Sequence, residues 1–266
     1  WNAWGARRND IVLVASGSAS SWMMDKLVKN PGGLHARITN NIYVRPFTLR
    51  ETEEYLESRG FSWSKYQILQ LYMSMGGIPF YLSLLDPSKT LINNINHLFF
   101  RKNSELKTEF DELYTAIFSN SGKYLEIVKL LNNHKEGMTY SEVQKSTGIT
   151  GSRLTTILNN LERCDFVLSY SQFGNKSKGT IYRLVDFYTL FYLKFIESSD
   201  TKDEEWWLHN YNSRSVASWQ GTTFELVCLT HLPQIRRQLG IDGISTSASS
   251  WRYVPRPQSS DGEEGA

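Results

Sequence analysis

Cysteine is scarce in this chain of 266 residues: only Cys164 and Cys228 occur, each among apolar neighbours. Two such thiols exclude a disulfide-rich scaffold, and we expect both to be buried in the reducing environment of the cytoplasm. The 5 histidines are scattered without metal-ligand spacing, so no metal cluster of histidine and cysteine is expected. No apolar run reaches membrane length, and the start lacks the layout of a signal peptide, which argues against a membrane partner.

An excess of charge of either sign is also missing. With 29 Lys and Arg against 27 Asp and Glu the net charge is +2, so nucleic-acid binding requires a local basic patch. Hydrophobic residues make up 40% and charged residues 21%, as in ordinary globular proteins, and the length predicts two or three domains. The chain begins at Trp1 and ends at Ala266 without a closing element, so we expect it to be a piece of a longer protein.

The sequence motifs of several enzyme classes are absent. A nucleotide triphosphatase needs a GxxxxGK[ST] loop around the phosphates and an acidic strand end for Mg²⁺, and neither occurs here. The dipeptide Gly122-Lys123 comes nearest, but Tyr124 follows it. GxSxG, HExxH and GxGxxG are missing too. On its own, the chain therefore has no complete set of catalytic residues.

Two short apolar stretches near the start have the pattern of strands. Residues 11–15 (IVLVA) form a β-branched run typical of a strand buried in a parallel sheet, and Ser16-Gly17-Ser18 follow as a turn. Residues 42–45 read as a second strand before Pro46. Because two strands alone cannot make a stable sheet, we expect the remainder of that sheet upstream of Trp1.

A block of helices is predicted next. Thr48–Glu51 and Ser64–Gln67 are capping boxes that each open a helix, and Gly60 is a plausible stop for the first. Residues 76–79 (GGIP) break the chain before a helical restart at 80–85. Further helical periodicity runs over residues 88–100, 104–118 and 122–132.

The following stretch has the order helix, turn, helix and β-hairpin, which is the winged-helix layout. A capping box at Thr139–Glu142 opens a helix that ends at Gly148, and strands are expected at 166–170 and 180–184, joined by a turn at 174–179. The second helix buries Leu154, Ile157, Leu158 and Leu161 and turns Arg153, Thr156, Asn160 and Arg163 to its other face, and the hairpin turn adds Lys176 and Lys178. Basic and polar side chains at these positions can reach the phosphates and bases of DNA. A solvated face, or one that binds protein, fits equally well.

The last third returns to helices. Asp186 caps a helix at 187–196 that is apolar nearly all round and is therefore buried. Residues 198–216, with Trp206-Trp207, read as a linker. A helix from about Ala217 is interrupted by Pro233, and the tail from Pro255 is loose.

Several of these blocks together resemble the archaeal-type ATPases of prokaryotes, a STAND branch of the AAA+ P-loop NTPases. The matching segments are IVLVASGSASSWM, GGLHARIT, PFTLRETEEYL, MGGIPFYL, GMTYSEV, GSRLTTILNNLERCDFV, IYRLVDFYTLFYLKF and WQGTTFELVCLTHLPQIRRQLGI. The resemblance implies a mainly α chain with an α/β remnant, built of five parts. These are the end of a P-loop ATPase domain (1–47), a helical lid (48–118), a winged helix (119–197), a linker (198–216) and the truncated start of a nuclease-like domain (217–266).

The resemblance also implies nucleotide contacts in the full-length protein, with ATP and Mg²⁺ as cofactors. Ser16 or Ser18 would face the terminal phosphate, although both fit a helix cap as well. Arg37 would sense or stabilise the transferring phosphoryl group, which is a catalytic role; the alternative is a surface arginine. Gly77 and Pro79 match the GxP element of the lid, whose proline starts a helix beside the adenine. The alternative for that element is a simple helix connection.

Glu225 shares a predicted helix face with Leu229 and Leu232, and a buried carboxylate needs a cation, a proton or a hydrogen-bond donor. The resemblance implies more, because the terminal domain of the family looks like a PD-(D/E)XK nuclease in which a helix acid helps to hold Mg²⁺. Glu225 is then a catalytic metal ligand whose partners lie beyond Ala266. The alternative is a rim residue that reaches water.

The leading expectation is a cytoplasmic, ATP-hydrolysing multidomain regulator of which this chain is an inactive fragment. Its expected partners are ATP, DNA through the winged helix, and a protein partner or a second copy. The rival is a DNA-binding regulator whose winged helix acts without catalysis.

Overall fold

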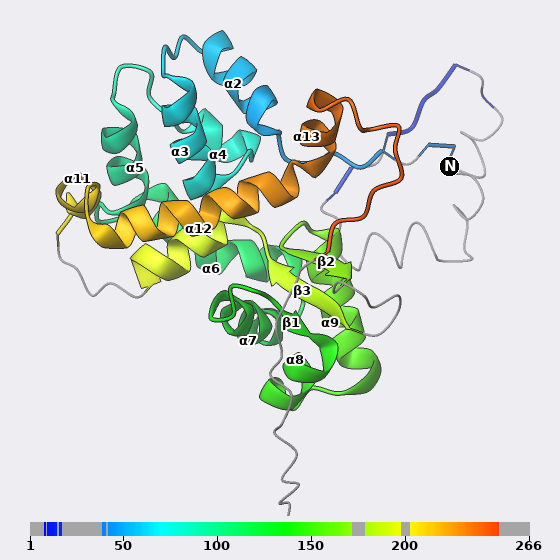
Figure 1. The fold of residues 1–266 in the computed structure, drawn as a ribbon. Coiled ribbons are helices and arrows are strands. Elements are labelled where there is room, and N and C mark those ends of the chain that lie inside the picture. Colours follow the sequence, from blue (N-terminus) through cyan, green and yellow to red (C-terminus); the bar gives the residue numbers. More distant parts are fainter. Residues whose placement is uncertain are drawn as a thin grey trace, which may run out of the picture.

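The computed structural model describes residues 8, 10–14, 16–17, 39–40, 42–171, 179–197 and 203–249. Within these residues the chain is mainly helical, with twelve α-helices, one π-helical turn and a three-stranded antiparallel sheet (Figure 1). No helix in this part of the chain has the length and apolar character needed to cross a bilayer.

The two strands expected near the start are not formed. Residues 11–14 and 42–45 have no regular structure, and Val12 and Val44 are 88% and 85% exposed. A strand is stable only when its backbone pairs with a neighbour, and no described residue pairs with either stretch. The expectation of α/β sheet strands was therefore wrong for the described residues of these segments.

A lobe of five helices follows, and its boundaries agree with the local sequence signals. The capping boxes at Thr48 and Ser64 are both formed, Gly60 has φ +85° after the first helix, and Pro79 starts the short helix after the double glycine. The helices are α2 (Leu49–Ser58), α3 (Lys65–Met75), α4 (Pro79–Ser83), α5 (Leu91–Phe99) and α6 (Glu105–Ile117).

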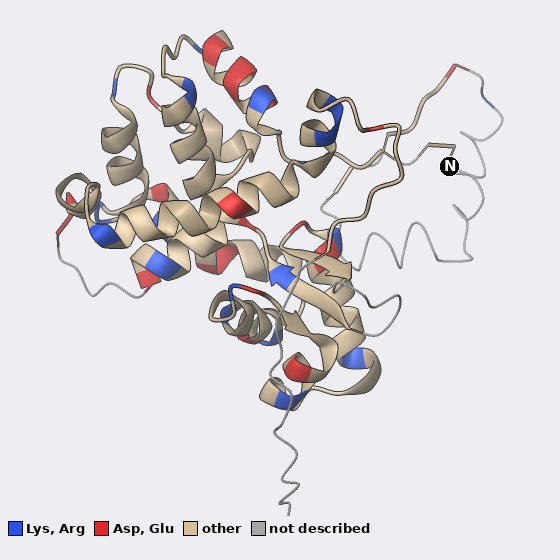
Figure 2. Cartoon of the chain, in the orientation of Figure 1, with Lys and Arg blue, Asp and Glu red and all other residues tan. Residues whose placement is uncertain are grey.

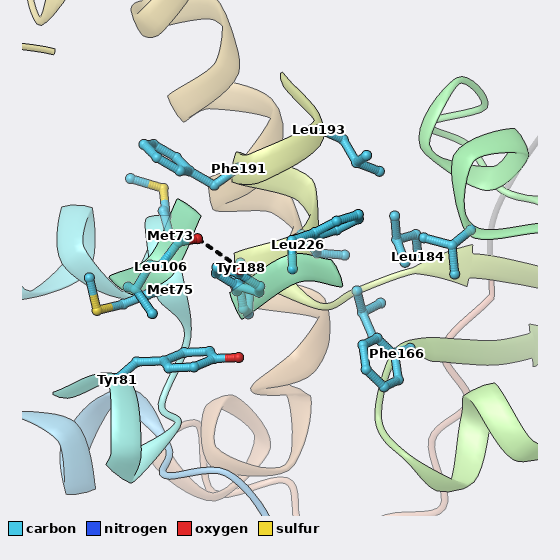
Figure 3. Packing of buried hydrophobic residues seen from close by; sticks show 14 of the residues in the cluster. Met73, Met75, Tyr81, Leu106, Phe166, Leu184, Tyr188, Phe191, Leu193 and Leu226 are labelled. Carbon is cyan, nitrogen blue, oxygen red and sulfur yellow. Dashed lines mark hydrogen bonds between the residues drawn. The ribbon is translucent and has the colours of Figure 1, made fainter. Parts of the chain in front are cut away.

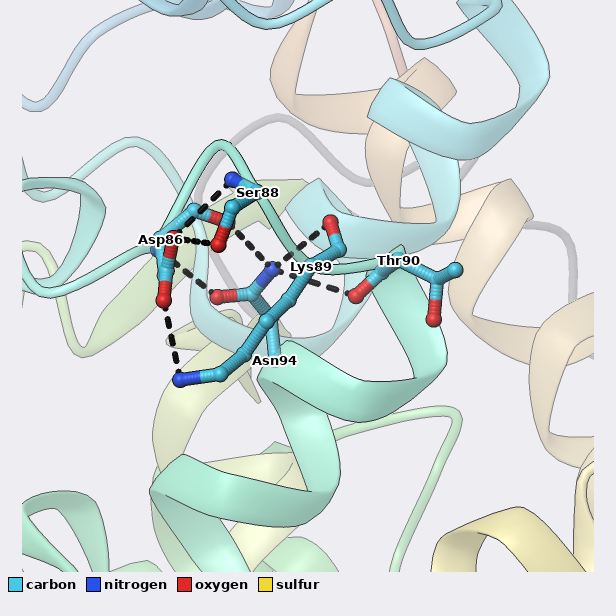
Figure 4. Close-up of polar contacts among 5 residues, drawn as sticks. All are labelled: Asp86, Ser88, Lys89, Thr90 and Asn94. Carbon is cyan, nitrogen blue, oxygen red and sulfur yellow. Dashed lines mark hydrogen bonds and ion pairs between the residues drawn. The ribbon is translucent and has the colours of Figure 1, made fainter.

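The loop between α4 and α5 is held together by the buried amide of Asn94 (Figure 4). Its nitrogen lies 3.0, 3.3 and 3.1 Å from the carbonyl oxygens of Asp86, Lys89 and Thr90, and its oxygen accepts from the Asp86 N–H at 2.8 Å. The Asp86 carboxylate accepts from Ser88 and pairs with Lys89, and these donors hold the pKa of Asp86 well below its usual value.

Residues 121–184 form a unit that we call the sheet subdomain. Its elements are α7 (Ser121–Asn132), β1 (Met138–Thr139), α8 (Tyr140–Thr147), α9 (Gly151–Arg163), β2 (Val167–Ser171) and β3 (Thr180–Leu184). The strand order is β1-β3-β2, with Tyr182 of β3 opposite Met138 on one side and Ser169 on the other. The capping box at Thr139, the left-handed Gly148 and the strands near 166–170 and at 180–184 are confirmed.

The last helices return to the lobe. They are α10 (Phe187–Phe191), the π-helical turn η3 (Tyr192–Glu197), α11 (Trp206–Asn210), α12 (Arg214–Thr230) and α13 (Leu232–Gln238). Helix α11 lies in the stretch expected as a linker, and Trp207 is only 1% exposed. Asn96 of α5 fixes it, since the amide donates to Glu204 O at 2.7 Å and accepts from the Trp207 N–H at 3.1 Å. Helix α11 therefore packs its Trp207 into the core, whereas most of residues 203–216 are partly or fully exposed. The interpretation of residues 198–216 as a linker between domains stays a prediction.

One hydrophobic core joins the lobe to the sheet subdomain (Figure 3). It runs from Met73 and Met75 of α3 past the buried helix α10 to Phe166 and Leu184 at the sheet. The Tyr188 hydroxyl of α10 donates to Leu106 O at 2.8 Å, so the one polar atom of this central ring is satisfied. Since apolar packing is continuous, the sheet subdomain and the lobe share one close-packed interior.

Candidate functional site

Helix α9 presents a polar face to solvent in the sheet subdomain. Leu154, Ile157, Leu158 and Leu161 are buried as the helical spacing predicts. Arg153, Thr156 and Asn159 are exposed on the other side. The Thr156 hydroxyl donates to Ser152 O at 2.8 Å, so it stays bound to its own helix and leaves the guanidinium and amide groups as the donors free to reach outward.

Asn160, predicted for this exposed face, is instead 3% exposed. Its amide donates at 2.8 Å to the hydroxyl of Tyr124 on α7, whose ring stacks on Phe118 at 3.9 Å. Helix α7 covers this flank of α9, so the polar side chain faces a neighbouring helix and the prediction was wrong. Asn159, one residue earlier, holds the exposed position. The helical pattern contains that signal, because Thr156, Asn159 and Arg163 recur at intervals of three and four residues.

The carboxyl end of α9 is covered by a segment from far upstream. Tyr43 lies with its hydroxyl 2.6 Å from Arg163 O and 2.7 Å from Asp165 Oδ2, across 120 and 122 residues of sequence. Asp165 follows the helix in the left-handed region with φ +59°, which an aspartate tolerates. Burial, and then the neighbouring Asp165 carboxylate, raise the pKa of Tyr43 far above its usual value, so the phenol stays protonated.

A pocket of about 500 Å³ opens between this segment and α9. Beside this pocket, the guanidinium of Arg45 lies over the Tyr43 ring, 5.5 Å from the ring centre. The half-buried Cys164 thiol nearby has its pKa raised to about 11 by desolvation, so it is a thiol at neutral pH. The pocket is lined by Tyr43, Arg45, Asn159, Glu162, Arg163 and Asp165. Sequence reasoning missed Tyr43 and Arg45, because no local pattern links them to a helix more than 100 residues away.

Charge on the sheet subdomain is mixed. Figure 2 shows basic positions on α8, α9 and β3 with acidic ones among them. Lys176 and Lys178, expected at the tip of the hairpin, lie outside the described residues. The face of α9 therefore depends on a small number of individually placed cations.

The double glycine before α4 meets the chain just upstream of α2. Gly76 has φ +67°, and a Cβ on Gly77 would overlap the backbone carbonyl of Phe47. The Phe47 N–H donates to Gly77 O at 2.8 Å, and Phe47 O accepts from the Tyr72 hydroxyl at 3.0 Å. The prediction that Pro79 starts a helix is confirmed. The predicted nucleotide contact of Gly77 and Pro79 stays a prediction.

The other predicted nucleotide residues are only partly described. Ser16 is exposed, whereas Ser18 and Arg37 lie outside the described residues. Their roles at a bound nucleotide stay predictions.

Glu225 is exposed on α12, whereas the next two residues, Leu226 and Val227, are buried in the core. The expectation of a buried carboxylate was therefore wrong, because the inward face of α12 is turned by one to two residues from the predicted one. Among the described residues no three histidine, cysteine, aspartate or glutamate side chains are grouped as metal ligands. The metal role of Glu225 stays a prediction.

Comparison with known proteins gives one distant similarity. The chain is 25% identical over 188 residues to an uncharacterized protein of Methanocaldococcus jannaschii. The match takes in 69% of this chain and 40% of that protein, so the chain spans less than half of the relative's length. No protein-family model matches the chain, and no solved structure matches it.

Proposed function

We propose that the sheet subdomain is a winged-helix domain that binds double-stranded DNA, with α9 as the helix that enters the major groove. The supporting observation is the exposed polar face of α9 on a helix, strand, helix, helix and hairpin arrangement that packs on the common hydrophobic core. An α-helix fits the major groove, and its outward side chains reach phosphates and base edges there.

The few charged groups on the polar face of α9 predict a modest affinity for DNA. The exposed Arg153 and the half-buried Arg163 each supply a guanidinium for backbone phosphates, and Asn159 supplies an amide that can both donate and accept. Because a few cations carry the binding, affinity falls with salt at a slope of about −0.9 per phosphate contacted. Non-specific dissociation constants of about 10⁻⁴ to 10⁻⁶ M at physiological salt are expected.

A second candidate is the ATP-dependent regulator implied by the resemblance, with this winged helix as its output. The observation that favours it is the contact of Gly77 with Phe47, which places the GxP-like turn at the end of the segment expected to leave the nucleotide domain. Binding of ATP and Mg²⁺ then belongs to the full-length protein. There, Arg37→Ala should retain nucleotide binding and slow hydrolysis by more than about tenfold; unchanged turnover would make Arg37 ordinary surface charge.

Fluorescence anisotropy with a labelled duplex of about 30 base pairs tests the DNA proposal. The chain should bind at about 50 mM salt and weaken steeply towards about 200 mM. Arg153→Ala should reduce both the affinity and the salt slope. Arg101→Ala is the matched control, since Arg101 is also exposed but follows α5 in the helical lobe. Absence of binding at low salt would favour a protein-binding face instead.

A further inference from the structure

The pocket beside α9 is lined by two arginines, Arg45 and Arg163, and by two acids, Glu162 and Asp165. Both carboxylates already accept a hydrogen bond. The Ser169 hydroxyl of β2 donates to Glu162 Oε1 at 2.5 Å, and the Tyr43 hydroxyl lies 2.7 Å from Asp165 Oδ2. Both acids therefore bind hydroxyl groups of the chain itself, and neither depends on a pocket arginine for a hydrogen-bond partner.

The two arginines, in contrast, have no carboxylate partner within the described part of the chain. Among the residues that the structure describes, neither Arg45 nor Arg163 lies within ion-pair distance of an acid. Both line the pocket, and they come from two segments, Arg45 from the upstream segment and Arg163 from the last turn of α9. The Tyr43 hydroxyl, 2.6 Å from Arg163 O, links the two segments, and Arg45 lies over the same phenol ring.

We infer that this pocket binds a phosphate group, with the guanidiniums of Arg45 and Arg163 as charged donors and the amide of Asn159 as a neutral one. Guanidinium forks match the oxygens of a phosphate, and a volume of about 500 Å³ accommodates one with its attached sugar. The formal charge of the lining is zero, so affinity comes from short-range donor geometry. Long-range attraction contributes little.

The inference rests on the proposed function for its favoured ligand, a phosphate of the DNA backbone at the carboxyl end of α9. Its new element is Arg45, which lies outside the sheet subdomain and before the first helix of the lobe. Binding DNA there would fasten the upstream segment to the same duplex that α9 contacts. A free phosphate or nucleotide has the same recognising chemistry, and the experiment separates the two sources.

The test compares Arg45→Ala and Arg45→Lys with Arg50→Ala in the whole chain. Arg50 is five residues away, is also exposed, and pairs with Glu54 at 2.9 Å on α2, so its loss reports unspecific charge removal. Duplex DNA is titrated by anisotropy at several salt concentrations, and inorganic phosphate is titrated separately by ³¹P NMR line broadening. Arg45→Ala should weaken DNA binding about tenfold at low salt and reduce the salt slope by about one contact. Arg45→Lys should keep the slope, and Arg50→Ala should match the parent.

Each outcome decides the inference. If the parent binds DNA and Arg45→Ala binds equally well, the phosphate pocket is refuted while the proposed function stands. Arg45-dependent binding of inorganic phosphate without DNA binding would support the pocket, assign a free ligand and refute the proposed function. Binding of neither probe would refute both.

Discussion

The Nε2 atom of His231 accepts a hydrogen bond at 3.0 Å from the backbone N–H of Leu49, which lies 182 residues earlier in the chain. The Nδ1 atom of the same ring donates to Val227 O at 2.8 Å. Both ring nitrogens are thus engaged in the neutral tautomer, and the ring packs edge-on against Tyr72 at 5.4 Å. His231 thereby ties the first turn of α2 to the last turn of α12.

Acid should weaken this tie. Burial lowers the pKa of His231 in the folded chain, whereas the unfolded chain has an ordinary histidine pKa of about 6.5. Below that pH the unfolded state takes up a proton that the folded state refuses, so the free energy of unfolding falls as the pH drops. Urea unfolding between about pH 7 and 5 should therefore show a steeper loss for the parent than for His231→Gln.

His209 provides the control for the sign. It is exposed, and its hydrogen bond to Asp203 at 2.8 Å raises its pKa. Its contribution to stability is present below the unfolded pKa and is lost as the pH rises. The free energy of unfolding should therefore fall less with rising pH in His209→Gln than in the parent. Equal pH slopes for the parent and His231→Gln would contradict the neutral role of His231.

Adjacent asparagines on α9 should respond in opposite ways. Asn160→Ala leaves the Tyr124 hydroxyl without its buried partner and should reduce the free energy of unfolding by about 1–3 kcal/mol. Asn159→Ala changes only an exposed side chain and should stay within about 0.5 kcal/mol. DNA affinity, measured where both variants are folded, should fall for Asn159→Ala alone. Loss of affinity only in Asn160→Ala would contradict the assignment of the exposed face.

Alanine substitutions at two glycines should change the free energy of unfolding in opposite directions. Gly77→Ala forces a methyl group into the carbonyl of Phe47 and should destabilise the chain by about 3 kcal/mol, since backbone must move. Gly221 lies within α12 with open space around it, so Gly221→Ala should stabilise the chain by about 0.5–1 kcal/mol. Thermal unfolding checks both, and a neutral Gly77→Ala would show that the Phe47 contact is easily displaced.

Local signals in the sequence predicted much of the fold. The capping boxes at Thr48, Ser64 and Thr139 and the strand at 180–184 depend on neighbouring residues only, and each is formed. The errors concern partners distant in sequence. The polar sequence around Trp207 gives no sign that this side chain is buried. In the structure, its backbone N–H donates to the Asn96 side chain of α5.

The candidate site shows the same division. The periodicity of α9 predicts its polar face, but Asn160 is buried because α7 covers one flank. No pattern in residues 42–45 indicates that Tyr43 contacts the end of α9, since that contact forms only after folding. Long-range contacts of this kind follow from tertiary packing and are not encoded in spacing.

Photo-crosslinking from α9 to DNA tests the central proposal most directly. A benzophenone amino acid is placed at Thr156 of α9 or, as the matched control, at Thr108 of α6; both threonines are exposed and bind a carbonyl of their own helix. After irradiation with labelled duplex at low salt, position 156 should crosslink and position 108 should not. Equal labelling at both positions, or labelling from 108 alone, would contradict DNA binding by α9.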